Sequence, residues 1–303
     1  MWSSHPLRPA WLLPQPGAVR LPLRFEPCFS TVPDSLGVIG LGRMAQALLM
    51  PLLEQGVVAA GDVIAVVGQA STCQRLATSL PKGVHLLAAA DPEARSVWTC
   101  NVQLLAIKPH QLDGVAASAP PVPEGMSPIL ISVLAGVPLE RLEAAFPGRR
   151  CVRAVPNTPC LVGAGLTGLA WGQGLTPEDQ QRVKAFFSPV SEVLELGESL
   201  LDAFLALTSS GPAYVAMVAE AMADGAVAAG LPRDLSHHLA HRTLAGTAAL
   251  LKEQELHPGQ LKDMVASPGG TTMAALRKLE QAGLRSALIE AVVAASEHGR
   301  NLR

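Results

Sequence analysis

Short apolar runs alternate with helical periodicity over the first half of this chain. Runs that stay apolar on both faces predict the strands of a parallel sheet covered by helices. The alternation itself predicts a doubly wound α/β domain, to which we assign residues 34–174. The predicted strands are 36–39, 63–67, 84–87, 102–107, 129–134 and 151–155, with helices at 43–55 and 71–79.

The pattern changes at residue 175, after which helical periodicity dominates. One more apolar run at 190–196 predicts a last strand, and the rest of 175–303 predicts an all-helical C-terminal domain. The helix predicted over 212–229 is small or apolar almost all round, so we expect it to be buried in a subunit interface. The other predicted helices are 233–254, 258–265, 271–281 and 285–298.

Residues 1–33 follow neither pattern. Proline recurs there without periodicity, and the segment contains three arginines, Arg8, Arg20 and Arg24, but a single acid, Glu26. An arginine-rich, acid-poor start resembles an organellar transit peptide, but a disordered or leader extension is the simpler interpretation. We therefore expect a cytoplasmic protein, with an organelle as the alternative if this segment directs import.

Composition narrows the range of functions. Of the 303 residues, 49% are hydrophobic and 16% charged, and the net charge is −2, which gives no electrostatic case for a nucleic-acid partner. The most apolar stretch, 213–231, is interrupted by Glu220 and Asp224, so we expect no transmembrane helix and no membrane partner. The five cysteines lack metal-ligand spacing, and His237 and His241 lack a neighbouring acid, so no metal site is predicted.

The strongest motif follows the first predicted strand. Gly40-x-Gly42-x-x-Ala45 lies between a strand and a helix, which is the context of the phosphate-binding turn in a Rossmann fold. Gly40 allows a tight turn, Gly42 lets the backbone approach a pyrophosphate, and Ala45 lets helix and strand pack closely. An ordinary glycine-rich turn is the alternative. The dinucleotide contacts predicted from this motif are Gly40, Leu41, Gly42, Arg43, Met44 and Ala45.

The turn after the second strand favours NADPH as the cofactor. An acid at this turn would hold the ribose 2′-hydroxyl of NAD, but no Asp or Glu occurs between Asp62 and Asp91. Gln69 and Ser71 can instead donate to a 2′-phosphate. NADH stays open as the alternative, because these side chains would also suit a simply solvated turn.

Three further strand ends carry residues suited to a ligand site. Ligands of a doubly wound sheet bind beyond the carboxyl ends of the strands. Each segment alone is also consistent with ordinary turn chemistry, but their position on successive strand ends favours a site. The segments are Ala106-Ile107-Lys108-Pro109, Ala135-Gly136 and Pro156-Asn157.

Two helix starts in the second half add candidate residues. Ser210 precedes Gly211-Pro212 at the start of one predicted helix. The segment 267–272, Ser-Pro-Gly-Gly-Thr-Thr, precedes another and offers free N–H groups and hydroxyls at a positive helix end. We call this segment the anion nest, because it would suit a carboxylate. A capped helix start is the alternative.

Taken in order, these motifs resemble those of the pyrroline-5-carboxylate reductase family. The resemblance covers residue 36 to the C-terminus and is most specific at 260–272. It implies hydride transfer from NAD(P)H to 1-pyrroline-5-carboxylate, which gives L-proline in the last step of proline biosynthesis. The motifs are Gly-Leu-Gly-Arg-Met-Ala at 40–45, Ala-Ile-Lys-Pro-His at 106–110, Val-Pro-Asn-Thr-Pro at 155–159, Ser-Ser-Gly-Pro-Ala-Tyr at 209–214 and Gln-Leu-Lys-Asp-Met-Val-Ala-Ser-Pro-Gly-Gly-Thr-Thr at 260–272.

The resemblance also implies an assembly and a set of roles. A Rossmann domain would be followed by a helical dimerisation domain, with the active site at the interface of a homodimer that assembles further into a homodecamer. Gly270, Thr271 and Thr272 would hold the substrate carboxylate, with Thr272 as the catalytic residue near the ring nitrogen and Ser210 in the wall of the site. The implied cofactor contacts beyond the phosphate turn are Ala106, Ile107, Lys108, Pro109, Ala135, Gly136 and Asn157.

Two other functions stay open from the sequence. One is a related two-domain NADP-dependent reductase that acts on another imine or on a hydroxy acid. The other is a non-catalytic NADP-binding regulator. One departure from the family pattern is the segment Ala-Asp-Pro-Glu at 90–93, where the family often has an asparagine that contacts the adenine ribose.

Overall fold

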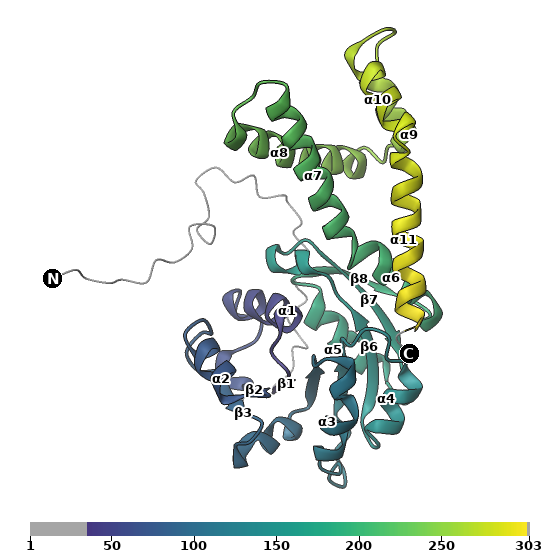
Figure 1. Cartoon of the computed structure of the whole chain (residues 1–303). Helices are drawn as coiled ribbons and strands as arrows, with labels where there is room; N and C mark the ends of the chain where they lie inside the picture. Colours follow the sequence, from purple (N-terminus) through teal and green to yellow (C-terminus); the bar gives the residue numbers. More distant parts are fainter. Residues whose placement is uncertain (1–34, 302–303) are drawn as a thin grey trace, which may run out of the picture.

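One mixed sheet organises most of the molecule (Figure 1). The computed structural model describes residues 35–301, so the extension predicted for residues 1–33 lies outside the described part. The eight strands of this part follow the order β3-β2-β1-β4-β5-β6-β7-β8. They are β1 (Leu36–Ile39), β2 (Val63–Val67), β3 (His85–Ala88), β4 (Val102–Leu105), β5 (Ile129–Ser132), β6 (Arg150–Val155), β7 (Gly165–Trp171) and β8 (Ser191–Glu195).

Strand direction divides the sheet into two parts. From β3 to β6 all neighbours are parallel, in the register Leu36↔Val63 and Leu36↔Val102 around the central strand β1. β7 runs antiparallel to β6, and β8 is parallel to β7. The parallel part therefore brings the carboxyl ends of β1, β2, β4, β5 and β6 to one edge, where the predicted ligand segments begin.

Helices cover both faces of the sheet, which confirms the doubly wound arrangement. Successive side chains of a strand point to opposite faces, so Val38 packs into the apolar cluster with Leu48 while Ile39 packs into the other cluster with Leu142. Because helices cover both faces of the sheet, the strands are apolar along their whole length. The covering helices are α1 (Arg43–Glu54), α2 (Ala70–Ala77) and α5 (Pro177–Phe187) on one face, with α3 (Leu112–Ser118), α4 (Leu139–Ala145) and α6 (Leu201–Thr208) on the other.

The remaining helices project away from the sheet (Figure 1). We call α7 to α11, residues 211–301, the helical arm. α7 packs against α8, and the C-terminal end of α11 returns to α6 beside the sheet. These helices are α7 (Gly211–Ala228), α8 (Arg233–Glu253), α9 (Pro258–Met264), α10 (Thr271–Gln281) and α11 (Leu284–Asn301).

The structure differs from the sequence-based expectation in two ways. The elements α3, α4, β7 and α6 were not predicted. In addition, β8 belongs to the sheet and α5 packs on it, although both had been placed in the helical domain 175–303. We therefore propose that the domain boundary lies near Leu196 instead of between residues 174 and 175.

One stretch of the described part is long and apolar enough to cross a membrane by length and composition alone. It is Glu198–Ala228, with a mean hydropathy of 1.3. From the sequence we considered only the stretch 213–231, whereas this one is longer because α6 and α7 follow one another almost without interruption.

Candidate active site

The phosphate turn has the geometry that its glycines predict. Gly40 has φ +89°, and a Cβ there would lie 2.7 Å from the carbonyl oxygen of Ala106, so the turn requires glycine. The same close approach brings the end of β1 against the end of β4. Gln46 fixes the turn by donating from Nε2 to the carbonyl of Leu41 at 2.8 Å.

The space in front of α1 is open. Gly42 is the N-cap of this helix, and a Cβ added to it would meet no atom within 4 Å. No side chain caps this helix start, and its first turn contains no acid. Ala45 is fully buried against the sheet, whereas Arg43 is exposed. These observations fit a pyrophosphate bound on the free N–H groups of α1.

The second anchor lies at the start of α2. Gln69 and Ser71 are both exposed, and the Ser71 hydroxyl lies 3.5 Å from Oε1 of Gln69. The first turn of α2 contains no acid, and its last turn carries Arg75. The two polar side chains can therefore donate to a phosphate without a carboxylate beside them to repel it.

The ends of β4 and β5 supply the next two segments. Lys108 is exposed, and its backbone N–H donates to Oε1 of Gln111 at 2.9 Å at the start of η4 (Pro109–Gln111). Gly136 is buried with φ +73°, so the Ala135-Gly136 turn also uses a conformation that favours glycine. Both segments leave from the edge of the sheet that carries the phosphate turn.

The end of β6 is joined to the start of the helical arm. Asn157, 4% exposed, donates from Nδ2 to the carbonyl of Thr208 at 3.0 Å and accepts from the N–H of Leu166 at 2.9 Å. The hydroxyl of Ser209 donates to the carbonyl of Pro156 at 3.0 Å. Ser210 follows directly, so two predicted motifs far apart in sequence meet here. Asn157 ties three elements together, and its contact with the cofactor stays a prediction.

The anion nest also has the predicted local geometry. Gly269 has φ +68°, and the N–H of Gly270 donates to the carbonyl of Ser267 at 3.0 Å. α10 has no side-chain cap and no acid in its first turn. Thr271 is exposed and Thr272 half-buried. The N–H groups at the start of this eleven-residue helix can therefore donate hydrogen bonds to an anion.

Within one chain, the anion nest does not reach the cofactor edge. The nest lies at the far end of the helical arm, away from the sheet (Figure 1). Both α10 and α11 lie between the nest and the sheet, because the nest precedes α10 and the next helix, α11, ends against α6. The 18 residues of α11 correspond to about 27 Å at 1.5 Å per residue. The two segments predicted to bind the dinucleotide and the carboxylate therefore lie apart within a single chain.

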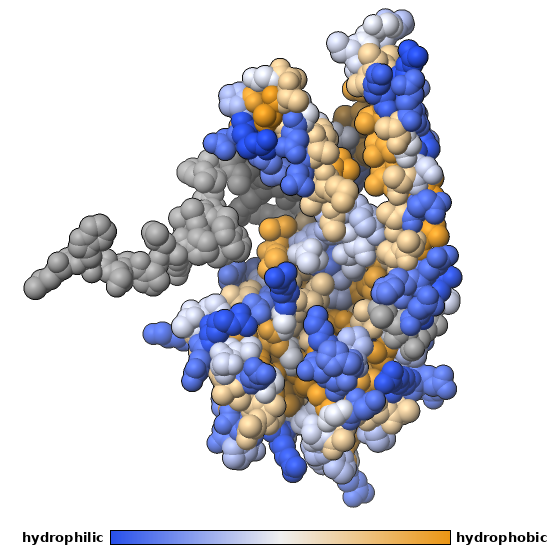
Figure 2. Space-filling view, viewed as in Figure 1, coloured by the Kyte–Doolittle hydropathy of each residue, from blue (hydrophilic) through white to orange (hydrophobic). Residues whose placement is uncertain are grey.

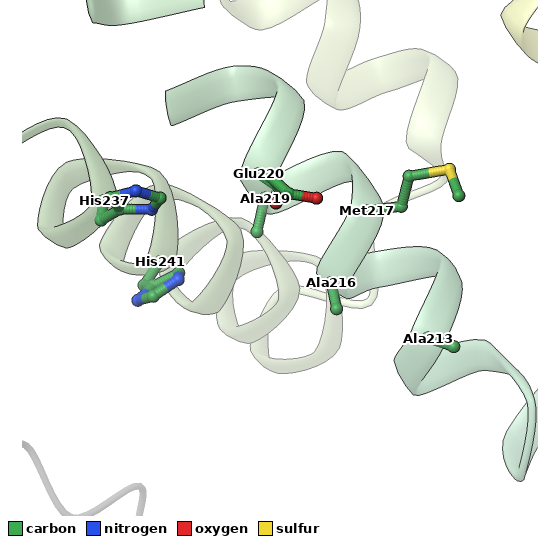
Figure 3. Close-up of a pocket in the computed structure, with 7 residues that line it drawn as sticks. All are labelled: Ala213, Ala216, Met217, Ala219, Glu220, His237 and His241. Atoms are coloured by element: carbon green, nitrogen blue, oxygen red, sulfur yellow. The ribbon is translucent and has the colours of Figure 1, made fainter. Parts of the chain in front are cut away.

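The helical arm exposes many large apolar side chains (Figure 2). On α7 only Ala219 and Ala223 are buried, whereas Met217 is 71% exposed. A groove of about 520 Å³ lies between α7 and α8. Figure 3 shows its lining, which is Ala213, Ala216, Met217, Ala219 and Glu220 from α7 with His237 and His241 from α8. An exposed apolar surface of this kind marks an interaction site.

Three cysteines are buried in the fold and are not candidate nucleophiles. Burial raises the pKa of the thiols of Cys100, Cys151 and Cys160. For Cys151, burial and then the nearby carboxylate of Glu143 raise the pKa to about 12. These thiols therefore stay protonated at neutral pH.

The sequence analysis missed a buried ion cluster. Arg153 on β6 is fully buried, and its guanidinium lies 2.9 Å from Asp202 and 3.3 Å from Glu198. Its signal was present: a lone arginine inside the predicted apolar strand 151–155, and two acids four residues apart, Glu198 just before α6 and Asp202 in its first turn. We gave these residues no role, because spacing alone does not show which strand faces that helix.

Two family models match this chain, one on each part. The dimerisation model of pyrroline-5-carboxylate reductase matches residues 198–302. A model described as NADP oxidoreductase, coenzyme F420-dependent, matches residues 35–136. The first match covers the helical arm with η6 (Glu198–Leu200) and α6, and the second covers the strands that carry the phosphate turn.

Named relatives and solved structures align over nearly the whole chain. The pyrroline-5-carboxylate reductase of Synechocystis sp. is 45% identical over 88% of this chain and 97% of its own, and that of Pisum sativum is 36% identical over 88% and 96%. The NADP-bound structure of pyrroline carboxylate reductase from Plasmodium falciparum has a TM-score of 0.75 at 26% identity, over 89% of this chain and 98% of that one. The Streptococcus pyogenes enzyme has a TM-score of 0.78 at 25% identity, over 88% and 98%.

Proposed function

The chain belongs to the pyrroline-5-carboxylate reductase family, and we propose that two copies of it together build the site in which 1-pyrroline-5-carboxylate is reduced to L-proline. The observation that carries this function is the alignment of relatives of that name over both the sheet and the helical arm. The reaction is the last step of proline biosynthesis. NADPH is the cofactor, in keeping with the NADP-bound Plasmodium falciparum structure.

The residues at the cofactor edge fit this dinucleotide. The open space at Gly42 and the free start of α1 would receive the pyrophosphate. Gln69 and Ser71 would hold the 2′-phosphate, which supports NADPH over NADH. When bound, NADPH supplies the hydride that reduces the C=N bond. The nicotinamide side would be lined by Ala106, Ile107, Lys108, Pro109, Ala135, Gly136 and Asn157.

The anion nest would hold the substrate. Gly270 would shape the turn, and the backbone N–H groups of Thr271 and Thr272 at the uncapped start of α10 would bind the carboxylate. The Thr272 hydroxyl would orient the ring nitrogen, and Ser210 would form part of the wall. A protonated imine is already electrophilic, so the protein mainly has to position two planar groups and neutralise one charge.

A second copy would complete the site. The nest of one chain precedes α10 at the far end of the arm, and the 18-residue helix α11, about 27 Å long, lies between α10 and the sheet (Figure 1). The dimerisation model matches the arm, and the apolar side chains exposed there are the kind that a homodimer buries. The same burial accounts for the apolar stretch Glu198–Ala228 without a membrane partner. We infer that the nest of each protomer faces the cofactor edge of its partner.

Assembly beyond the dimer and the location in the cell are further proposals. A homodecamer of such dimers is what the family resemblance implies. A cytoplasmic location is the simplest proposal, and import into an organelle would require residues 1–33 to act as a transit peptide.

The decisive assay follows NADPH oxidation with 1-pyrroline-5-carboxylate, with proline measured in parallel. We expect one proline for each NADPH oxidised and a lower rate with NADH. A folded protein that binds NADPH without turning it over would support a regulator. Turnover only with another imine or a hydroxy acid would support a different reductase.

A further inference from the structure

We propose that Glu198 is a positioning residue for the loop that contacts the nicotinamide, and that Arg153 holds Glu198 in place for this task. The loop is residues 133–138, between β5 and α4, and carries Ala135-Gly136. The inference rests on the NADPH-binding part of the proposed function, because it takes Ala135-Gly136 as a cofactor contact.

Glu198 joins the end of this loop to the sheet. Its Oε1 accepts from the backbone N–H of Leu139, the first residue of α4, at 2.7 Å. The same oxygen accepts from Nη1 of Arg153 at 3.3 Å. A carboxylate at the start of a helix satisfies a free N–H and faces the positive end of the helix. Glu198 thus supplies from a distant segment the cap that Pro138, the residue before α4, lacks.

The loop is fixed at its other end by the sheet. The N–H of Val133 donates to the carbonyl of Leu105 at 3.0 Å, and the N–H of Leu134 donates to the hydroxyl of Ser132 at 3.3 Å. Between these bonds and Glu198, the chain turns through Gly136 at φ +73°. The position of the Ala135-Gly136 peptide therefore depends on both anchors.

Arg153 binds the Glu198 carboxylate from the protein core. Its side chain is fully buried, and Nη2 donates to Oδ1 of Asp202 at 2.9 Å. Among the described residues, its Nε is buried without a hydrogen-bond partner. A buried ion cluster often adds little stability over apolar side chains of equal volume. We therefore assign the Arg153 guanidinium the role of orienting Glu198 rather than that of stabilising the fold.

The ion cluster also links the loop to the helical arm. Glu198 and Asp202 lie in η6 and α6, which join the sheet to α7. α11 packs over the cluster, since a Cβ on Gly299 would lie 4.0 Å from Cβ of Asp202. The segment matched by the dimerisation model thus contributes the anchor for the cofactor loop.

The test compares NADPH with a fragment that lacks nicotinamide. Dissociation constants for NADPH and for 2′-phospho-ADP-ribose are measured by calorimetry on the full chain and on Glu198→Ala. We expect NADPH binding to weaken on the order of tenfold, as for a lost hydrogen bond to a charged group, while fragment binding stays unchanged. Glu198→Gln keeps an oxygen that can accept from Leu139, so it should restore most of the affinity for NADPH.

A matched control comes from the other end of β6. Asp179 also accepts a backbone N–H at a helix start, from Thr176 at 2.9 Å, and also pairs with an arginine of β6, Arg150. It caps α5, away from the loop. Asp179→Ala should lower the melting temperature and leave both dissociation constants unchanged.

Each outcome has a distinct meaning. Equal weakening of NADPH and fragment in Glu198→Ala, or no weakening of either, would overturn the inference. If the alanine variant does not fold, Glu198→Gln decides: wild-type affinity for NADPH supports the role of the retained oxygen, and a tenfold loss overturns it. Wild-type protein that binds NADPH but does not reduce 1-pyrroline-5-carboxylate would contradict the proposed function and leave this inference standing.

Discussion

Two glycines of one motif have different roles at the level of single residues. Gly40 is required by backbone geometry, because its φ of +89° and its 2.7 Å approach to Ala106 leave no room for a side chain. Gly42 is not required by geometry, since a Cβ there meets nothing within 4 Å. Its small size matters only if a ligand occupies the space in front of α1.

This difference predicts the effect of Gly42→Asp. Aspartate is a favourable N-cap, so the melting temperature should be unchanged or slightly raised. Its charge would stand where the pyrophosphate binds, so the dissociation constant for NADPH should rise by on the order of a hundredfold. Fluorescence titration with NADPH checks this, and wild-type affinity in the variant would remove the turn from the cofactor site.

The proposed role of Thr272 leads to a prediction about the steady-state kinetics. Thr272→Ala should raise the KM for 1-pyrroline-5-carboxylate and lower kcat about tenfold, because the hydroxyl would no longer orient the ring nitrogen. Steady-state rates with the substrate varied measure both. Thr243→Ala is the control, since this exposed threonine of α8 donates only to its own helix, to the carbonyl of Leu239. Kinetics equal to the control would place Thr272 outside the site.

The raised pKa of Cys151 leads to a prediction about stability at alkaline pH. Burial raises the pKa of Cys151 from its ordinary value of 9.0 to about 12 in the folded chain, so the folded chain keeps a proton that the unfolded chain loses. Its contribution is therefore complete below pH 9.0 and is lost as pH rises toward about 12, at about 1.4 kcal/mol per pH unit. Urea unfolding at about pH 8 and about pH 10 should show a smaller loss in Cys151→Ala than in the wild type. Equal losses would contradict the assignment.

At the level of elements, the sequence predicted the parallel strands and the long helices well. Strands buried on both faces are continuously apolar, and the helices of the arm are regular in period, so both leave a clear pattern. β7 was missed because Gly165 and Gly168 interrupt its apolar pattern. Gly168 is there for packing: a Cβ would lie 2.9 Å from the ring of Phe204, so α6 can lie directly on this strand.

The exposed apolar surface of α7 leads to a prediction about self-association. Met217 is 71% exposed and lines the groove between α7 and α8. If a second copy covers it, Met217→Asp would bury an unpaired charge and weaken self-association by on the order of a hundredfold. Sedimentation equilibrium measures this. Met126→Asp is the control, because Met126 lies in the loop between α3 and β5, away from the arm. A Met217→Asp variant that self-associates like the wild type would exclude this face.

At the level of the whole molecule, the sequence identified the segments that we propose form the site, but not their arrangement. The phosphate turn and the anion nest each have a local signature, because each is a short backbone motif at a helix start. Their separation along the helical arm depends on how the helices pack, which no local pattern records. The ion cluster of Arg153, Glu198 and Asp202 was missed for the same reason, since its members meet only in the folded chain.

The central claim is that one site is built from two chains, and subunit complementation tests it most directly. One variant, Gly42→Asp, blocks the phosphate turn, and another, Thr271→Asp, places a repelling charge in the anion nest at a helix position that tolerates acids. Each alone should be nearly inactive. When the two are co-expressed, we predict about a quarter of wild-type activity, because half of the dimers are mixed and each has one intact site of two. No recovery from verified mixed dimers would contradict the account, since a site contained within one chain could not be restored by mixing.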